Sequence, residues 1–191
     1  MKYPNYEQLV EIIKNNGIVF QQITLTSNIQ SDFYYDLKKI LHDQESLHLI
    51  AGSLLEQAIK YNVKSIGGLE LGSIPLTTAV LMLAWDKGVN LTGFTVRKNV
   101  KKHGLQKKIE GIVREPIMIL EDVITSGKSV ANAIDALLQE GYRVNSVVCV
   151  LDRQEESITN ILKQRDISYI SLFEHSEFKP YIEERLRNKK F

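Results

Sequence analysis

One stretch of the chain, residues 117–129, constrains the fold more than any other. It opens with four apolar residues at 117–120, a run typical of a strand that is covered on both faces. Two carboxylates, Glu121 and Asp122, follow the run, and then come small, hydroxylated and glycine residues. From Val130 onward, apolar residues recur at helical spacing. A buried strand that leads directly into a helix belongs in a parallel sheet flanked by helices.

The same stretch also predicts a ligand. A strand–loop–helix turn directs backbone N–H groups and the positive end of a helix toward one point, which suits a phosphate group. Carboxylates beside that point cannot bind phosphate. They suit hydroxyl groups, whose protons they accept, or a hydrated divalent cation. A phosphate, paired hydroxyls and Mg²⁺ together describe a phosphorylated sugar.

Two other interpretations compete for this stretch. Its last residues, 127–129, match the G-K-S end of the nucleoside-triphosphate P-loop, but that motif needs a glycine where this chain has Asp122. Alternatively, the stretch is an ordinary connection in which Thr125 or Ser126 caps the helix. Capping leaves the acidic pair unexplained, because unpaired charge at the end of an apolar strand is costly.

Composition bounds the class of protein. The 191 residues suffice for one α/β domain with a real core, and two full domains would be cramped. The net charge of +1 gives no overall attraction to nucleic acid or to an anionic membrane. No apolar run approaches the roughly 20 residues that span a bilayer, the N-terminus lacks an apolar signal region, and the single cysteine is Cys149. We therefore expect a cytoplasmic protein with neither a nucleic-acid nor a membrane partner.

Apolar periodicity and the positions of glycine and proline predict alternating helices and strands. Helices are predicted near residues 9–13, 46–58, 75–85 and 130–138 and at the C-terminus, with Ser46 capping the second and Pro75 opening the third. Strands are predicted at residues 65–69, 91–96, 117–120, 147–151 and 169–173. This order indicates a mostly parallel sheet, in which ligands bind at the carboxyl ends of the strands. Polar residues that fall at those ends are Glu70, Arg97, Glu121, Asp122, Asp152 and Arg153.

Residues 117–129 closely resemble the phosphoribosyl-pyrophosphate motif of the type I phosphoribosyltransferases. The resemblance implies that Glu121 and Asp122 contact the 2- and 3-hydroxyls of the ribose. It also implies that the following loop wraps the 5-phosphate with backbone and hydroxyl donors, from Thr125, Ser126, Gly127, Lys128 and Ser129. Val123 and Ile124, between the acidic pair and this loop, are assigned to phosphoribosyl-pyrophosphate binding as well. The implied fold is a mostly parallel sheet flanked by helices with a small N-terminal hood, formed here mainly by residues 1–40 of a single domain spanning residues 1–191.

A second resemblance lies in a basic stretch after the strand predicted at residues 91–96. Taken alone, Arg97, Lys98, Lys101 and His103 indicate a solvated basic loop, but long loops without periodicity are commonly active-site lids. The stretch is similar to the R-K-x-x-K-x-H-G loop of orotate phosphoribosyltransferases, which reaches into the neighbouring subunit's site. The resemblance implies that these four side chains bind phosphoribosyl pyrophosphate and that the protein is a homodimer with shared sites. Catalytic roles fall to Lys101 and His103, which face the departing pyrophosphate, and to Asp122.

A glycine-rich turn at residues 67–76 precedes the third predicted helix. Such a turn can be no more than a tight connection. It resembles the pyrophosphate loop of the family, G-x-E-x-G-G-x-P-L, with Ser73 in place of the second glycine of the pair. The resemblance assigns Glu70, Leu71 and Gly72 to phosphoribosyl-pyrophosphate binding.

Arg153 is the candidate for recognising the base. It follows Asp152 at a strand end, where the two residues could simply form a surface ion pair. Family members carry a D-R at the corresponding place, with the arginine gripping the carboxylate of orotate. Bidentate recognition of a carboxylate is a task suited to a planar guanidinium.

A segment near the N-terminus bears on the base as well. Phe20 and residues 25–36 resemble the hood segment F-x-L-x-S-G-x-x-S-x-Y-Y-x-D of the family. From it, Phe33 and Tyr34 would contact orotate together with Thr125, although aromatic residues are as often part of a core. The segment departs from the family pattern at four positions: Thr26, Asn28, Ile29 and Gln30.

The expected function is that of an orotate phosphoribosyltransferase in pyrimidine (UMP) biosynthesis. Such an enzyme transfers ribose 5-phosphate from phosphoribosyl pyrophosphate to orotate, giving orotidine 5′-phosphate and pyrophosphate. Mg²⁺ is the implied cofactor, held through the substrate, with Glu121 and Asp122 as its candidate protein ligands. Two alternatives stay open: transfer to another base, and a non-catalytic regulator that senses phosphoribosyl pyrophosphate. Lys101 and His103 argue against the regulator, because binding alone needs no leaving-group machinery.

Overall fold

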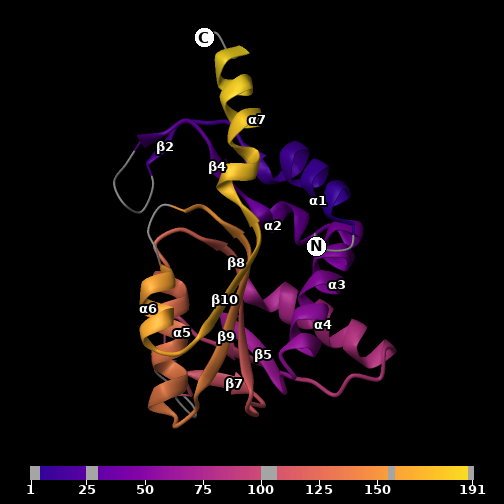
Figure 1. Cartoon of the computed structure of the whole chain (residues 1–191), viewed down its shortest axis with the longest axis vertical. Helices are drawn as coiled ribbons and strands as arrows, with labels where there is room; N and C mark the ends of the chain where they lie inside the picture. Colours follow the sequence, from indigo (N-terminus) through magenta and orange to yellow (C-terminus); the bar gives the residue numbers. More distant parts are fainter. Residues whose placement is uncertain (1–4, 25–29, 100–106, 155–157, 189–191) are drawn as a thin grey trace.

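The computed structural model describes residues 5–24, 30–99, 107–154 and 158–188, and a six-stranded sheet lies at its centre (Figure 1). In spatial order the strands are β10 (Ser168–Glu174), β9 (Val144–Asp152), β8 (Ile117–Ile124), β5 (Ser65–Leu69), β6 (Thr92–Val96) and β7 (Ile109–Gly111). The first five run parallel to one another, and β7 pairs antiparallel with β6. The mostly parallel sheet predicted from the sequence is confirmed.

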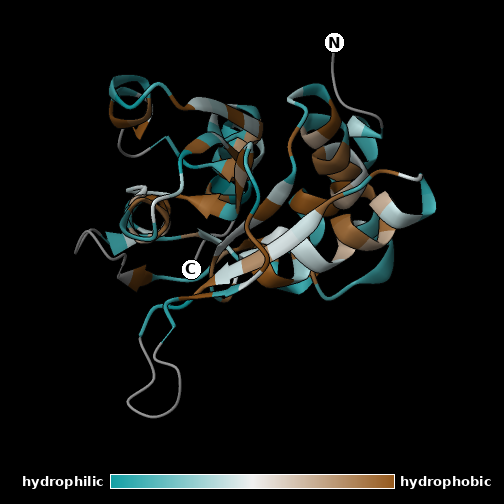
Figure 2. Ribbon diagram, turned by 90° about the horizontal axis from the view of Figure 1, so that it is seen from below, coloured by the Kyte–Doolittle hydropathy of each residue, from teal (hydrophilic) through white to brown (hydrophobic). Residues whose placement is uncertain are grey.

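Helices cover both faces of the sheet (Figure 1). On one face lie α3 (Gln44–Lys60) and α4 (Ser73–Asp86), and on the other lie α5 (Lys128–Gln139) and α6 (Ile158–Gln164). Met118 and Leu120 belong to the core on the α3 side, whereas Ile117 and Ile119 belong to the core on the α5 side. Figure 2 shows hydrophobic residues along the strands between these layers. This double coverage is why β8 begins as a continuous apolar run.

Short N-terminal elements form the hood at the carboxyl edge of the sheet. They are α1 (Tyr6–Ile12), a π-helical turn (Ile13–Gly17), α2 (Leu37–Ile40), and two antiparallel pairs, β1 (Ile18–Val19) with β4 (Tyr34–Tyr35) and β2 (Ile23–Thr24) with β3 (Gln30–Ser31). The last helix, α7 (His175–Asn188), runs up beside β4 (Figure 1). Its Phe178 packs against Tyr35 with ring centroids 6.1 Å apart, so the hood and α7 share a core. Within the described ranges, the helices are too short or too polar to cross a membrane.

Strand β8 is longer than the apolar run suggested, and its length places the acidic pair inside the strand. The sequence predicted an end at Leu120, whereas β8 continues to Ile124. The reason lies in its neighbours, because pairing with β5 stops at Ile119 while pairing with β9 continues to Ile124. Glu121 and Asp122 therefore lie on a stretch of β8 that is paired with β9 and no longer with β5.

Two helix starts differ from the prediction. The cap of α3 is Asp43 and not Ser46, because Asp43 Oδ2 accepts from the backbone N–H and the hydroxyl of Ser46, at 2.9 and 2.7 Å. Helix α4 begins at Ser73, before Pro75. Proline is tolerated in the first turn of a helix, so it marks the start only approximately.

The basic stretch, for which the sequence predicts a long loop without periodicity, is followed by strand β7. Its residues pair with β6, and the N–H of Ile112 donates to the carbonyl of Gly93 at 3.0 Å. A strand of three residues is too short to show an alternating pattern, so periodicity does not predict it.

The close approach of β5 and β6 generates a stability prediction at Gly67. A Cβ at this position would overlap the carbonyl oxygen of Phe94 and lie 2.7 Å from its ring, and the two residues are paired in the sheet. Gly67→Ala should therefore lower the free energy of unfolding by about 1–3 kcal/mol, the usual cost of overpacking a core. Urea titration followed by circular dichroism measures it.

Gly52→Ala is the matched control, because a Cβ at Gly52 in α3 would meet no atom within 4 Å. Removing a helical glycine there should raise the free energy of unfolding by roughly 0.5–1 kcal/mol. Equal stability of Gly67→Ala and the wild-type protein would show that β5 and β6 are not packed as described.

Candidate active site

A cavity of about 250 Å³ opens at the carboxyl ends of β5 and β8. The chain leaves β5 for β6 on one side and returns to β8 on the other, so these two strands flank the switch point at which α/β sheets bind ligands. The cavity is lined by Tyr35, Lys38, Leu69, Glu70, Leu71, Gly72, Lys98, Glu121, Asp122, Val123, Thr125, Ser129 and Arg153. Candidates from four separate stretches of the sequence thus meet in one place.

The acidic pair is buried in the floor of this cavity, with Glu121 and Asp122 each 6% exposed. Their positions along β8 put Asp122 on the side of the hood. Its Oδ1 accepts from the backbone N–H of Val123 at 2.9 Å, and its Oδ2 lies 3.5 Å from Lys38 Nζ. Lys38 belongs to α2, so an ion pair joins the hood to the end of the strand.

Glu121 is the less satisfied of the two carboxylates. Its Oε2 is buried and has no hydrogen-bond partner among the described residues. Burial raises the pKa of Glu121 well above its ordinary value, the neighbouring charge of Asp122 raises it further, and Lys38 acts in the opposite direction. A buried acceptor without a donor is costly, so a ligand that brings hydroxyl groups would relieve this cost.

Gly72 explains how the turn after β5 can lie against the pair. A Cβ at Gly72 would stand 2.6 Å from Asp122 Oδ1, although the backbone of Gly72 is helical and suits any residue. Glycine is therefore required here for close approach and not for conformational freedom. The peptide bond between Glu70 and Leu71 is cis. Glu70 Oε1 accepts from the backbone N–H of Lys98 at 2.9 Å, which joins the ends of β5 and β6.

The loop predicted to hold a phosphate leads into α5. Thr125 and Ser129 line the cavity, whereas Ile124 is part of the core and Ser126 and Lys128 are exposed. The N-cap of α5 is Gly127, at φ 71°, and not Thr125 or Ser126 as the capping interpretation required. A Cβ on Gly127 would stand 2.8 Å from Ile158 Cγ1, so glycine suits both the backbone and the space. The N-terminus of α5 and two hydroxyls thus border the cavity.

Arg153 also lines the cavity and is buried against two rings of the hood. Its guanidinium carbon is 5.3 Å from the ring centre of Phe33 and 5.8 Å from that of Tyr35. Asp152 has partners of its own, since its carboxylate accepts from Tyr169 Oη at 2.7 Å and from the backbone N–H of Gln154 at 2.8 Å. The surface-pair interpretation of Asp152 and Arg153 therefore accounts poorly for the burial of Arg153.

The prediction named Phe33 and Tyr34 as the hood aromatics of the base site, but the aromatic ring that lines the cavity is Tyr35, and neither Phe33 nor Tyr34 lines it. Phe33 contacts Tyr35, with ring centroids 5.8 Å apart, and lies beside Arg153 behind that lining. Side chains alternate along an extended chain, so Phe33 and Tyr35 share one side and Tyr34 points to the other. This alternation can be recognised in the sequence only once the position of the short strand β4 is known.

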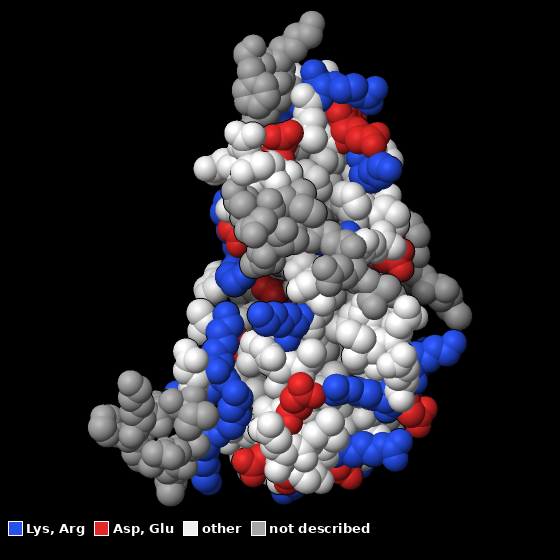
Figure 3. All heavy atoms as spheres, turned by 90° about the vertical axis from the view of Figure 1, so that its left-hand side faces the viewer, with Lys and Arg blue, Asp and Glu red and all other residues white. Residues whose placement is uncertain are grey.

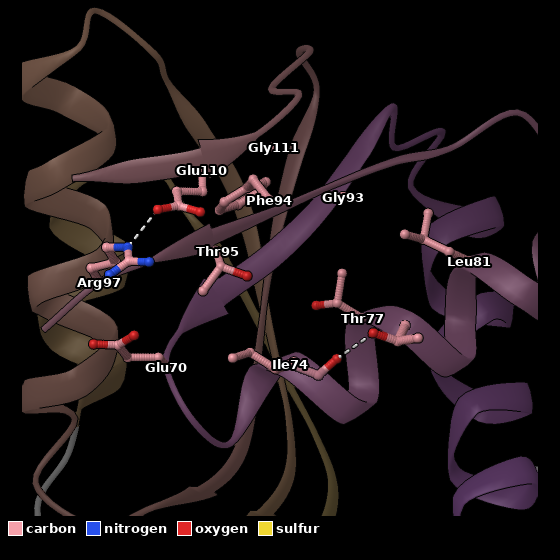
Figure 4. Close-up of a pocket in the computed structure, with 11 residues that line it drawn as sticks. Glu70, Ile74, Thr77, Leu81, Gly93, Phe94, Thr95, Arg97, Glu110 and Gly111 are labelled. Atoms are coloured by element: carbon pink, nitrogen blue, oxygen red, sulfur yellow. Dashed lines mark hydrogen bonds and ion pairs between the residues drawn. The ribbon is translucent and has the colours of Figure 1, made fainter. Parts of the chain in front are cut away.

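The basic stretch divides between two cavities. Lys98 lines the cavity of the acidic pair, whereas Arg97 lines a neighbouring one of about 320 Å³ and donates from Nε to Glu110 Oε1 at 2.6 Å (Figure 4). Glu70 lines both cavities. Lys101, His103, Thr26, Asn28 and Ile29 lie outside the described residues. Figure 3 shows Lys and Arg side chains along one edge of the molecule, which suits a polyanionic ligand.

Sequence reasoning missed Lys38 as well as Tyr35. Lys38 reaches Asp122 across 84 positions of sequence, and nothing local distinguishes it from its neighbour Lys39. Only the fold, which sets α2 over the end of β8, reveals the contact.

Individual relatives identify the family, although no protein-family model matches the chain. The orotate phosphoribosyltransferase of Rhodopseudomonas palustris (strain BisB5) is 36% identical over 177 residues, which cover 90% of this chain and 94% of that protein. The orotate phosphoribosyltransferase of Streptomyces avermitilis is 32% identical over 171 residues, which cover 88% of this chain and 94% of that protein.

Solved structures agree. Orotate phosphoribosyltransferase of Mycobacterium tuberculosis H37Rv in complex with Fe(III) dicitrate gives a TM-score of 0.76 at 28% identity, covering 91% of this chain and 98% of that one. The same protein in complex with 5-phospho-α-D-ribosyl 1-diphosphate gives 0.75 at 25% identity, covering 92% and 99%. Adenine phosphoribosyltransferase of Leishmania tarentolae, at a TM-score of 0.59 and 14% identity, shares the fold alone. Since relatives at 36 and 32% identity align with nearly the whole chain, it belongs to the orotate phosphoribosyltransferase family.

Proposed function

We propose that this protein is an orotate phosphoribosyltransferase, which joins ribose 5-phosphate from phosphoribosyl pyrophosphate to a ring nitrogen of orotate and releases pyrophosphate. One observation carries the proposal beyond family membership. A buried acidic pair, two hydroxyls at a helix N-terminus and a buried arginine all border one cavity. Each suits a different part of the two substrates.

The acidic pair and the α5 loop suit phosphoribosyl pyrophosphate. Ribose hydroxyls would donate to Asp122 and to Glu121, whose Oε2 has no donor among the described residues. The 5-phosphate would lie at the N-terminus of α5, where Thr125 and Ser129 face the cavity. The pyrophosphate would then extend toward the wall that carries Lys98.

Arg153 and the hood rings suit orotate. The guanidinium can bind the orotate carboxylate through two parallel hydrogen bonds. Phe33 and Tyr35 flank that guanidinium and offer flat faces to a pyrimidine ring. In this arrangement the base and the anomeric carbon approach each other between the hood and the end of β8.

Displacement at the anomeric carbon passes through an oxocarbenium-like state, so the protein supplies positioning and charge neutralisation more than covalent chemistry. Negative charge develops on the departing pyrophosphate, and we assign its stabilisation to Lys101 and His103 of the basic stretch, with Lys98 and Arg97 binding the same group. We assign to Asp122 the orientation of the ribose for this displacement. Interactions that strengthen as charge develops accelerate the reaction.

Mg²⁺ fits the residues of this site. Carboxylate oxygens are hard ligands, and in the described part of the chain no cluster of three His, Cys, Asp or Glu side chains could hold a metal ion. These facts suit a cation that arrives with phosphoribosyl pyrophosphate, keeps several waters and contacts Glu121 or Asp122. When bound, Mg²⁺ would be held by Glu121 or Asp122 and would offset the negative charge of the pyrophosphate.

A homodimer is supported by the exposed face of α4. Ile74, Met82 and Trp85 are 38, 62 and 81% exposed, and their spacing places them along one side of the helix. Aligned apolar side chains of this size mark protein interfaces, and tryptophan is often their anchor. Ile74 also lines the cavity that contains Arg97, the first residue of the basic stretch (Figure 4). A second copy of the chain bound to α4 would therefore lie beside Arg97.

The proposed function is tested by pyrophosphate release from phosphoribosyl pyrophosphate and Mg²⁺ with a panel of orotate, uracil, adenine, guanine and hypoxanthine. Turnover should require orotate and both other components, and chelation of Mg²⁺ should abolish it. Turnover with a purine or with uracil in preference to orotate would contradict the base assignment. Binding of phosphoribosyl pyrophosphate with no turnover on any base would favour a regulator.

The ribose assignment predicts that Asp122→Asn weakens phosphoribosyl-pyrophosphate binding by about 10- to 150-fold, the worth of hydrogen bonds to a charged group. Calorimetric titration measures the affinity. Asp135→Asn is the control, because Asp135 is an exposed partner of Arg165 on α5, away from the cavity. Unchanged affinity in Asp122→Asn would refute the assignment.

If Arg153 binds the orotate carboxylate, Arg153→Ala should lose catalytic efficiency with orotate more than with a base that lacks a carboxylate. Removing one member of a buried charge pair costs about 2–5 kcal/mol, or roughly 30- to several-thousand-fold in kcat/KM for orotate. The variant should also discriminate far less between orotate and uracil, which lacks the carboxylate. Arg153→Lys should not restore the activity, because a point charge cannot reproduce the planar fork. Arg165→Ala is the exposed control, and equal losses with both bases would return Arg153 to a structural role.

The shared-site assignment predicts complementation between two inactive variants. In a dimer of one Lys101→Ala and one Asp122→Asn subunit, one site would be wholly wild type if Lys101 acts on the partner's substrate. Random exchange of equal amounts should then recover about one quarter of wild-type activity, because half the dimers carry one intact site of two. No recovery after exchange is confirmed by native mass spectrometry would mean that Lys101 acts within its own subunit.

A further inference from the structure

The first turn of α7 meets the hood at the base end of the cavity. His175, the first residue of α7, stacks on Phe33 with ring centroids 5.7 Å apart and planes 9° from parallel. Its Nδ1 lies 2.9 Å from the hydroxyl oxygen of Tyr35. Phe33 and Tyr35 are the same two rings that flank the guanidinium of Arg153, at 5.3 and 5.8 Å. One histidine therefore contacts both neighbours of the arginine assigned to the base.

The loop that carries Arg153 is tied to the same turn of α7. Gln154 Nε2 donates to Glu174 Oε2 at 3.1 Å, and the backbone N–H of Ser176 donates to Gln154 Oε1 at 3.2 Å. Glu174 and Ser176 are the two sequence neighbours of His175. The start of α7 thus holds the Arg153 loop on one side and the hood rings on the other.

The hydrogen-bonding needs of the two groups set the direction of the hydrogen bond between them. Burial raises the pKa of Tyr35 far above its ordinary value, so the phenol keeps its proton. Burial also lowers the pKa of His175, the charges of Arg153 and Lys179 lower it further, and Glu183 acts in the opposite direction, so the ring is neutral. Among the described residues, His175 Nδ1 is the acceptor within reach of the Tyr35 hydroxyl, so we assign the tautomer in which Nδ1 accepts from Tyr35 and the ring proton lies on Nε2.

We propose that His175 is a positioning residue of the base site: by accepting from Tyr35 and stacking on Phe33, it holds the two rings where they flank Arg153. This inference rests on the proposed function and deepens it, because the group so positioned recognises a planar, carboxylate-bearing base. Among the described residues, the hydrogen bond and ring contacts of His175 are with Tyr35 and Phe33 and not with the acidic pair or the α5 loop. Loss of the Nδ1 acceptor should therefore weaken orotate binding and leave phosphoribosyl-pyrophosphate binding unchanged.

The test uses the full-length protein and three variants. His175→Phe keeps an aromatic ring beside Phe33 and removes the acceptor. His175→Asn places an amide oxygen near the position of Nδ1 and restores an acceptor that does not titrate. Tyr35→Phe removes the donor from the other side. For each variant and for the double variant His175→Phe/Tyr35→Phe, the KM for orotate, the KM for phosphoribosyl pyrophosphate, kcat and the melting temperature are measured.

His175→Phe should raise the KM for orotate about 2- to 12-fold, the worth of one neutral hydrogen bond. The KM for phosphoribosyl pyrophosphate should not change, and His175→Asn should return the orotate KM toward the wild-type value. Tyr35→Phe should raise the orotate KM by a similar factor, and the double variant should lose little more, because both single changes break the same bond.

Three results would overturn the inference while leaving the proposed function intact: an unchanged orotate KM in His175→Phe, equal changes in the KM of both substrates, or fully multiplicative losses in the double variant. A lower melting temperature with an unchanged orotate KM counts among these, because it describes a purely structural histidine. A wild-type protein that releases no pyrophosphate with orotate would instead overturn the proposed function, and this inference with it.

Discussion

Burial of two adjacent carboxylates, Glu121 and Asp122, is the constraint on which the rest of this structure depends. Both lie on the part of β8 that is no longer paired with β5, and each is 6% exposed. Like charges in a buried place repel each other and lose their hydration, which is why the pKa of Glu121 is raised. Three features of the surrounding structure offset this cost. Gly72 has no side chain, which leaves room for Asp122, and Lys38 forms an ion pair with Asp122. A cavity lies over both carboxylates.

The Asp122 side chain connects three parts of the structure around the cavity. Asp122 contacts the turn after β5 through Gly72, its own strand through the N–H of Val123, and the hood through Lys38. Arg153, which lines the same cavity, lies beside the hood rings of Phe33 and Tyr35. The start of α7 forms hydrogen bonds both to Tyr35 and to Gln154, the residue after Arg153. The hood therefore contacts the acidic pair through Lys38 and Arg153 through Phe33 and Tyr35. A small N-terminal segment thus takes part in both halves of the proposed reaction.

Much of the fold and part of the site could be predicted from the sequence, because both follow from local patterns. Buried strands are visible in the sequence as apolar runs. Parallel sheets bind ligands at the carboxyl ends of their strands, and on this basis the sequence predicted that Glu70, Asp122 and Arg153 lie together, as they do in one cavity. What failed depends on partners distant in the chain. The true end of β8 is set by pairing with β9, and Lys38 reaches Asp122 across 84 positions. The choice between Tyr34 and Tyr35 depends on a strand of only two residues, which no periodicity reveals.

The central claim is that Glu121 Oε2, which has no donor among the described residues, gains one from a sugar diol, and proton release on binding tests this claim most directly. Hydroxyl donors and Mg²⁺ favour the charged carboxylate, so ligand binding should lower the raised pKa of Glu121 and release a proton. Calorimetric titration of phosphoribosyl pyrophosphate with Mg²⁺, in buffers of different ionisation enthalpy at several pH values above the ordinary glutamate pKa of 4.5, counts those protons. The wild-type protein should release more protons than Glu121→Gln, in which the titrating group is gone. Equal proton release by the two proteins would contradict the account.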